Sequence, residues 1–303
     1  MHQNHEQGRR EFLMSLGAAG ACAALPGPDP AVAAQAGATP PALTVRGAID
    51  AIIKAVPGAP RRRSVDTVKC GDPSQPLSGI VTTFLASAEV VQKTVGLGAN
   101  LIITHEPIFY NHLDETDWLA ADRVYWYKRR MIVENRLTVW RFHDYWHLLE
   151  PDGILTGVLR LLEWKQPARS KTPEICEIAP MPLIELARFL KKKFASPYVR
   201  IVGDPRLECR RVGVSPGASG GRSQIRLLGR NDVDVVVCGE VAEWETSEYA
   251  RDALTGGMKK GLIVLGHVQS EEAGMQYLAE WLRPRFPGVE ITHVPTGSAF
   301  TYV

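Results

Sequence analysis

The stretch Ala99-Asn-Leu-Ile-Ile-Thr-His-Glu-Pro-Ile-Phe109 decides how this chain folds. Leu101–Ile103 is a run of three aliphatic residues that predicts a short buried strand, and Pro107 ends it. His105 and Glu106 therefore fall at the carboxyl end of the strand, which is where ligands bind in open α/β folds. The alternative is a surface loop that carries a polar pair, and the rest of the chain has to decide between the two.

A strand and a helix precede this stretch. Residues 78–85 predict a strand, and residues 88–96 predict a helix that Gly98 ends. With the opening stretch they make a strand–helix–strand unit of the size that a parallel pair of strands requires.

A second unit with the same pattern lies near the other end of the chain. It consists of a strand at 233–237, a helix at 244–254 and the apolar run Leu262–Leu265, which stops at His267 as the first unit stops at His105. The likeness is one of pattern, not of identical residues. It predicts an α/β fold of two related lobes, each a mixed sheet flanked by helices, with a site between them.

The remaining elements follow from apolar periodicity. Further helices are predicted at 45–56, 122–135, 153–164, 183–194 and 271–283, and further strands at 137–140, 199–202 and 211–214. Ser270 is the expected N-cap of the last helix. Lys69–Pro73 is interpreted as a turn. The Gly-rich loop Ser215–Gly221 lacks both the dinucleotide fingerprint and the Walker lysine, so it is interpreted first as a turn and second as a phosphate site.

Four histidines follow strands: His105, His143, His147 and His267. His143 and His147 are four residues apart, as are His267 and Glu271, so each pair shares one face where its segment is helical. Each histidine alone has a structural explanation, such as stacking among the aromatic residues near 145. Their joint placement at strand ends favours a metal site, and imidazoles combined with carboxylates suit zinc, manganese or iron.

The cysteines do not suggest a thiolate site. Outside the first 36 residues they are Cys70, Cys176, Cys209 and Cys238, widely spaced and without a Cys-x-x-Cys pair. Cys238 follows three valines and is expected to be a buried core thiol. A disulfide between distant cysteines stays open at this point.

The net charge of +2 and the absence of a nucleic-acid-reading motif in the sequence argue against a nucleic-acid partner. Residues 1–36 are typical of a twin-arginine signal that is removed: Arg9-Arg10, an apolar run at 16–25 too short to span a bilayer, and a small-residue cleavage region. A lipoprotein reading through Cys22 is weaker, because Ala19 stands where a larger aliphatic residue is expected. The export machinery is thus one expected partner, the destination is periplasmic or secreted, and no stable membrane anchor is expected.

Four motifs occur in the order seen in the Nif-three-like family, whose members carry a dinuclear metal centre, and this chain resembles that family. They are Leu101–Phe109, Val139-Trp-Arg-Phe-His-Asp-Tyr-Trp-His147, Gly239-Glu240 and Gly266-His-Val-Gln-Ser-Glu271. The resemblance covers residues 65–303, with 37–64 as a linker and short helix. Within that range, residues 65–165 and 232–303 would surround the site, and residues 166–231 would form an intervening segment.

The resemblance implies two divalent ions per chain in a central cleft, held by His105, Glu106, His147, His267 and Glu271, with Glu271 as the bridge. The family's first motif usually has His-His where this chain has His105-Glu106. Its second motif usually ends in an aspartate where this chain has His147. The two changes compensate in ligand charge, which leaves the metal open among zinc, iron and manganese.

The resemblance also implies a toroidal homo-hexamer and a function. Family members are often labelled type-two GTP cyclohydrolase I homologues, although nothing in this sequence supplies a guanine pocket. We expect a metal-dependent hydrolase that activates a bridging water against a small molecule, nucleotide-like or a cyclic amide. His143, Asp144 and Glu240 are the expected proton-transfer or supporting residues. The alternative is a non-catalytic, ring-forming scaffold that binds metal for stability.

Overall fold

The computed structural model describes residues 42–165 and 174–303, all of which belong to one unit, Ala42–Val303. The predicted signal at 1–36, with Cys22 inside it, and the start of the predicted linker lie outside the described residues. Among the helices of the described ranges, none combines the length and apolar character that crossing a membrane requires.

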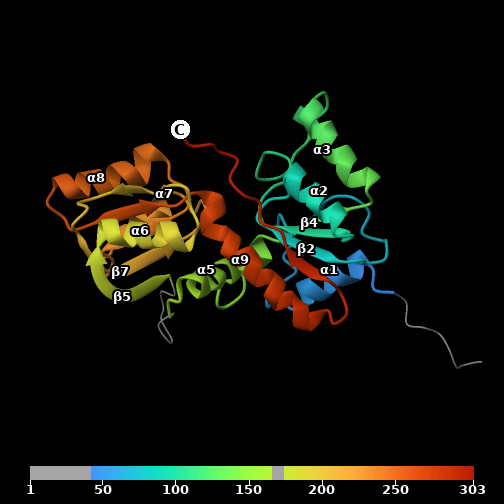
Figure 1. Ribbon diagram of the computed structural model, residues 1–303, viewed down its shortest axis with the longest axis horizontal. Helices are drawn as coiled ribbons and strands as arrows, with labels where there is room; N and C mark the ends of the chain where they lie inside the picture. The colour runs from blue at the N-terminus through green and yellow to red at the C-terminus, as the bar shows by residue number, and fades with distance from the viewer. Residues whose placement is uncertain (1–41, 166–173) are drawn as a thin grey trace, which may run out of the picture. The chain divides into compact units, whose positions relative to one another are not determined.

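The first sheet has five strands in the order β1-β4-β3-β2-β10 (Figure 1). Their bounds are Val68–Cys70 for β1, Ile80–Thr83 for β2, Leu101–Thr104 for β3, Thr138–Arg141 for β4 and Ile291–His293 for β10. β10, β2, β3 and β4 run parallel, and β1 is antiparallel to β4. The predicted parallel pair is confirmed, with Ile80 opposite Leu101.

The second sheet has the order β5-β7-β8-β9-β6. Its strands are β5 Ile175–Pro182, β6 Arg200–Val202, β7 Glu208–Ser215, β8 Val235–Cys238 and β9 Gly261–Val264. β7, β8 and β9 are parallel, and the two edge strands are antiparallel to their neighbours. The fold is therefore the predicted one, two mixed sheets flanked by helices. Residues 174–231 supply three of the five strands of the second sheet.

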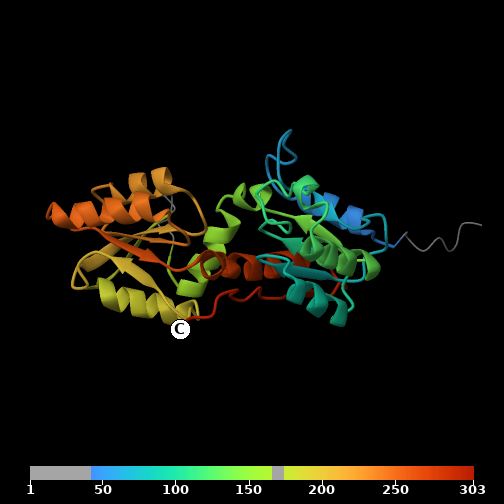
Figure 2. The ribbon, with the colours of Figure 1, turned by 90° about the horizontal axis from the view of Figure 1, so that it is seen from above.

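Helices cover both faces of each sheet (Figures 1 and 2). Their bounds are α1 Val45–Lys54, α2 Ala88–Gly96, α3 Arg123–Glu134, α4 Asp144–His147, α5 Gly153–Leu162, α6 Leu183–Lys193, α7 Gly221–Leu228, α8 Glu248–Thr255 and α9 His267–Leu282. Ile103 of β3 packs with α1 and α9 residues on one face, and Ile102 packs with α2 and α3 residues on the other. Strands buried on both faces read as continuous apolar runs, which is why the sequence marks them well.

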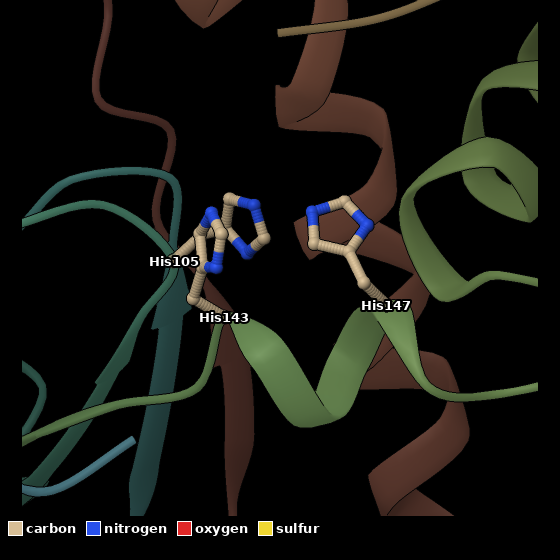
Figure 3. A group of neighbouring side chains, drawn as sticks. All are labelled: His105, His143 and His147. Carbon is tan, nitrogen blue, oxygen red and sulfur yellow. The ribbon is translucent and has the colours of Figure 1, made fainter. Parts of the chain in front are cut away.

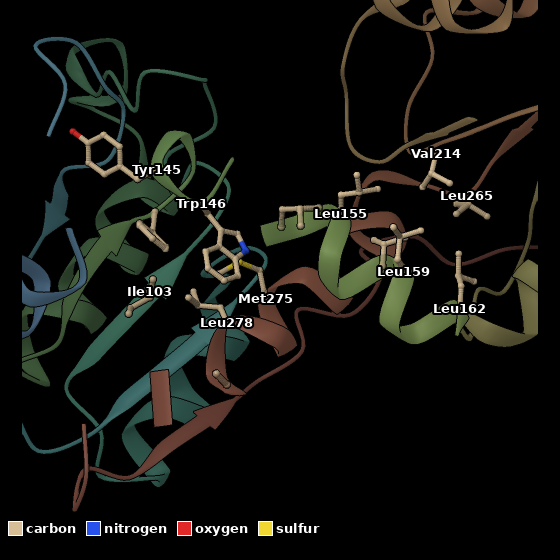
Figure 4. Close-up of a cluster of buried hydrophobic side chains, with 14 of the residues drawn as sticks. Ile103, Tyr145, Trp146, Leu155, Leu159, Leu162, Val214, Leu265, Met275 and Leu278 are labelled. Atoms are coloured by element: carbon tan, nitrogen blue, oxygen red, sulfur yellow. The ribbon is translucent and has the colours of Figure 1, made fainter. Parts of the chain in front are cut away.

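One apolar core passes from the first sheet to the second along α5 and α9. It joins Ile103, Trp146 and Met275 to Leu159 and Val214 (Figure 4). α9 begins directly after β9 of the second sheet, yet it packs against β2 and β10 of the first. Gly157 of α5 permits close packing of α5 on α9, because a Cβ there would lie 2.4 Å from the Ala273 carbonyl oxygen. α9 therefore links the end of β9 in the second sheet to β2 and β10 in the first sheet.

The structure corrects two local predictions and settles one alternative that the sequence left open. α9 begins at His267, so Ser270 lies inside the helix and is not its N-cap; Gly266, at φ 103°, takes that place. The interpreted turn at Lys69–Pro73 contains the end of strand β1. The four described cysteines are buried free thiols, which excludes a disulfide among them.

Candidate metal centre

The chain turns sharply where β4 ends, and this turn places three functional side chains. His143 precedes the single-turn helix α4, which ends at His147. The buried Asp66 carboxylate accepts the backbone N–H groups of His143 (2.8 Å), Asp144 (2.9 Å) and Tyr145 (2.7 Å). It thereby satisfies the donors at the start of a helix that has no capping side chain of its own. Asp66 fixes the orientation of both histidines relative to the sheet.

The other side of the centre is the first turn of α9. His267 and Glu271 lie one helical turn apart, with His267 Nε2 3.1 Å from Glu271 Oε2. Glu271 packs against the Gly-rich loop, where a Cβ on Gly217 would lie 2.0 Å from Glu271 Oε1 and φ is +70°. The Ser270 hydroxyl accepts the Gly217 N–H at 2.9 Å. The loop thus serves as a close-packed turn behind Glu271, in accord with its first interpretation.

These elements bring two groups of ligand atoms together. His105, His143 and His147 offer nitrogens that all lie within 4.8 Å of one another, and so do ligand atoms of His105, Glu106 and Glu271. Figure 3 shows the first group, with the imidazoles of His105 and His143 stacked and that of His147 reaching toward them from the end of α4. His105 belongs to both groups. Three imidazoles are a common zinc set, and mixed imidazole and carboxylate sets suit zinc, iron and manganese.

His267 joins the second group through its Nε2 atom, which lies 3.6 Å from Glu106 Oε1. We call His105, His143 and His147 the histidine half of the centre. We call Glu106, His267 and Glu271 the carboxylate half. His105 connects them, since its Nε2 lies 3.6 Å from Glu271 Oε2.

Each of the four histidines has its Nδ1 atom held from outside the centre. His143 Nδ1 lies 3.0 Å from Asp144 Oδ1, and His147 Nδ1 lies 2.7 Å from Asp152 Oδ2. His267 Nδ1 lies 3.2 Å from Glu240 Oε1. The fourth contact joins His105 Nδ1 to the Phe142 carbonyl oxygen at 3.3 Å. Such outer contacts fix the tautomer and leave Nε2 free to face a metal, as in metal-binding histidines generally.

One buried atom requires a partner that the protein does not supply. His105 is fully buried, and within the described residues its Nε2 has no hydrogen-bond partner. Buried polar atoms are otherwise nearly always paired, because an unpaired one costs free energy. A metal ion at this position would give Nε2 its missing partner. The residues present therefore fit the metal that the sequence predicts.

The two halves differ electrostatically. Burial lowers the pKa of His143 to about 4 and that of His105 well below its ordinary value. Burial also lowers the pKa of His267, but the contacts with Glu240 and Glu271 outweigh burial and raise this pKa to about 10. Burial also lowers the pKa of His147, but the contact with the Asp152 carboxylate outweighs burial, so the pKa of His147 is raised. Burial raises the pKa of Glu106. Perturbed groups gathered in this way are typical of functional sites.

All eight residues singled out from the sequence lie in or against this cluster. Glu106 and the predicted ligand histidines line its centre, and His143 lies among them. Asp144 and Glu240 lie outside it, each against a histidine Nδ1. The sequence reasoning missed Asp66, Arg141 and Asp152. Asp152 had a usable signal, because an aspartate directly before an apolar helix is a preferred N-cap.

Comparison with known proteins now places the chain. Residues 64–298 match the family described as Duf34/NIF3 (NGG1p interacting factor 3). A Streptomyces coelicolor protein named GTP cyclohydrolase 1 type 2 homolog is 28% identical over 53% of this chain and 60% of its own length. A Chlamydia pneumoniae protein of the same name is 22% identical over 77% of this chain and 90% of its own length.

Solved structures show the same fold. A Staphylococcus aureus hypothetical protein superposes with a TM-score of 0.68 at 18% identity, over 86% of this chain and 100% of that one. A Bacillus cereus protein related to NIF3 has a TM-score of 0.68 at 14% identity, over 86% and 99%. At these identities the likeness establishes the two-sheet α/β architecture. The chemistry has to come from the site itself.

Proposed function

This chain belongs to the Duf34/NIF3 family, and from that premise we propose that it is an exported dinuclear-metal protein that hydrolyses a small molecule. The observation that carries the proposal is the pair of ligand groups that share His105. Two ions bound there would lie close together. A pair of divalent ions supplies Lewis acidity and lowers the pKa of bound water, which is the basis of two-metal hydrolysis.

The chain's own residues then have separate roles. His143 and His147 direct Nε2 inward because Asp144 and Asp152 hold their Nδ1 atoms. Glu271 is 4% exposed and faces both His105 and His267, which suits a bridging carboxylate. The Glu240 carboxylate is half-exposed, and its contact with His267 lowers its pKa. Being ionised at neutral pH and open to solvent, Glu240 orients His267 and links its Nδ1 atom to solvent, which suits a supporting role in proton transfer.

A cavity beside the centre gives a small substrate room to bind. Its volume is about 310 Å³, at the lower end of the range for small-molecule sites. Its lining includes His267 and Glu240 of the centre together with Tyr198, Arg200 and Phe300. Arg200 is already paired with Glu243 at 2.8 Å, so the aromatic side chains and the backbone make most of the recognition surface. This favours a compact ring-containing substrate over a strongly charged one.

The name of the curated relatives suggests which substrates to test first. Because those proteins are called GTP cyclohydrolase 1 type 2 homologues, the assay panel should contain GTP beside cyclic amides, esters and phosphoesters. Metal-dependent turnover that is lost in both His105→Ala and Glu271→Ala, with melting behaviour retained, supports a hydrolase. Negligible turnover across the panel, together with metal-dependent melting, supports the alternative of a metal-binding scaffold.

Export and assembly have tests of their own. Replacing Arg9 and Arg10 by lysine should retain the precursor in the cytoplasm, and unchanged export would refute the twin-arginine signal. We also propose a homo-hexamer. Native mass measurement of the mature protein should give six chains, and a monomer in solution would refute the ring.

A further inference from the structure

Arg141 is a buried cation that lies beside the metal centre without offering it a ligand. It is the last residue of β4, and its side chain is fully buried. Burying a guanidinium is costly unless charged and polar partners surround it. The contacts of the Arg141 guanidinium therefore indicate which parts of the fold this buried charge stabilises.

Three of these contacts hold the segment that follows β3. Arg141 Nε donates to the His105 carbonyl oxygen at 3.0 Å, and Nη1 donates to the His112 carbonyl oxygen at 2.5 Å. Nη1 also lies 3.8 Å from Asp114 Oδ2. Asp114 in turn accepts the backbone N–H groups of Ile108 and Phe109. Arg141 therefore fixes the backbone that carries His105 and Glu106.

The remaining contact reaches Glu106 itself. Arg141 Nη2 lies 3.6 Å from Glu106 Oε2, an ion-pair contact, and it has no hydrogen-bond partner among the described residues. The other carboxylate oxygen, Oε1, lies 3.7 Å from His143 Nε2 and 3.6 Å from His267 Nε2. The carboxylate is thus divided between two neighbours: one oxygen faces the metal centre and the other faces a buried cation.

We propose that Arg141 is a positioning residue that makes Glu106 a one-oxygen metal ligand. A free carboxylate can bind an ion through one or both oxygens, and the choice changes the coordination number. The guanidinium retains Oε2 and so directs Oε1 alone to the ion. It also neutralises part of the charge that a buried glutamate brings to the centre. The inference rests on the proposed metal site and adds to it the residue that sets the binding mode of Glu106.

A double-mutant cycle tests this coupling. The variants are Arg141→Met, Glu106→His and their combination, and the measurement is the Zn²⁺ affinity of the full chain in competition with a chelating dye. Loss of an outer partner typically weakens metal binding about 10- to 100-fold. We expect a loss of that size for Arg141→Met beside Glu106. In the Glu106→His background, where the introduced neutral ring needs no cation, we expect a clearly smaller loss, because only the contacts of Arg141 with the His105 and His112 backbone and with Asp114 are removed. Equal losses in both backgrounds would overturn the inference.

A spectroscopic readout separates positioning from stability. With Co²⁺ as the probe, Arg141→Met should weaken the visible absorption band, because a two-oxygen Glu106 raises the coordination number. An unchanged spectrum in a folded variant would contradict the inference. Where Arg141→Met does not fold, Arg141→Lys takes its place, since lysine keeps the charge but lacks the planar fork of donors. It should weaken Zn²⁺ binding more beside Glu106 than in the Glu106→His background; equal losses again refute the coupling.

The wild-type protein distinguishes failure of the metal site from failure of the role of Arg141. If the wild type binds no Zn²⁺ or Co²⁺, the proposed metal site is wrong, and the role of Arg141 is wrong with it. If the wild type binds both metals and the cycle shows no coupling, the metal site stands and only the role of Arg141 is refuted.

Discussion

The histidine half and the carboxylate half of the centre prepare for a metal in different ways. The histidine half is built around the end of β4 and keeps His143 neutral by burial, with a pKa of about 4. In the carboxylate half, burial also disfavours charge on His267, but Glu240 and Glu271 hold it protonated, with a pKa of about 10. Burial disfavours charge on two imidazoles of the histidine half, His105 and His143, whereas the acidic side chains of the other half favour charge on His267.

Because of this difference, the two ions of the proposed centre would not be equivalent. Neutral imidazoles suit a borderline ion such as zinc, whereas carboxylate oxygens also accept harder ions such as manganese. His105 connects the halves, so loss of this residue should affect both. Substitutions confined to one half should therefore show whether each half can bind its ion without the other.

The largest effect is expected from removing one ligand of each half. His147→Ala should abolish binding in the histidine half, and His267→Ala should abolish binding in the carboxylate half. Each should reduce the metal content from about two ions per chain to about one. Elemental analysis after gel filtration measures this, with His112→Ala as the control that removes an imidazole outside both halves. Loss of both ions in either single variant would show that the halves do not bind independently.

A smaller effect is expected from Gly217→Ala, which acts on the centre through Glu271. Its Cβ would lie 2.0 Å from Glu271 Oε1, so the carboxylate has to move. Metal affinity in the carboxylate half should fall about tenfold or more, and the histidine half, which Glu271 reaches only through His105, should be weakened less.

Gly220→Ala is the matched control for this substitution. Gly220 also has a positive φ, +82°, but a Cβ there has no atom within 4 Å. It therefore carries a similar backbone strain without the clash. Equal metal affinities for the two variants, measured by chelator competition, would exclude the proposed contact with Glu271.

Asp152→Asn should have a more moderate effect, on the histidine half. Asp152 holds His147 Nδ1 and also caps α5 by accepting the Leu155 N–H at 2.9 Å. Asparagine keeps the cap and loses the charge, so metal affinity should fall about tenfold with little change in melting temperature. Asp152→Ala should lose the cap as well, at a cost of about 1 kcal/mol. If Asp152→Asn melts as early as Asp152→Ala, the charge is needed for folding and not for the metal.

A pH dependence is also expected in the metal-free protein. The folded pKa of His267 is raised, so its stabilising contribution is complete below the unfolded value of 6.5 and is lost as pH rises toward about 10. The folded pKa of His143 is depressed, so its neutral state becomes costly as pH falls from 6.5 toward about 4. The free energy of unfolding, compared with that of His267→Gln and His143→Gln at each pH, should show these opposite slopes. Parallel slopes would contradict the distinction between the halves.

The sequence predicted the parts of the fold that are buried on both faces. The runs in β3, β8 and β9 are apolar almost throughout, so their pattern was plain. β5 was missed because it is a half-exposed edge strand. Glu177, Pro180 and Pro182 interrupt the apolar pattern by which a strand is recognised. β10 has only three residues and gains its stability from pairing with β2, far away in the chain. Pairing between strands so far apart in the chain leaves no recognisable pattern in the local sequence.

The centre was predictable for a different reason. His105 and His143 follow the neighbouring parallel strands β3 and β4, whose carboxyl ends meet at one sheet edge, so their proximity followed from topology. His267 follows β9 of the second sheet and was placed by the likeness of the two strand–helix–strand units. The start of α9 was misplaced because Gly266 adopts a positive φ and lets the helix begin at His267. Arg141 was not recognised because a lone arginine in an apolar strand gives no sign of its partners. Its role depends on the position of Glu106, which only the folded chain shows.

The most direct test of the two-metal centre is the metal content of the protein purified without chelators or an affinity tag. Elemental analysis of the folded chain should find about two transition-metal ions per chain, as a two-metal centre requires. A folded protein that contains none, and that binds none when Zn²⁺, Mn²⁺ or Fe²⁺ is added, would contradict it.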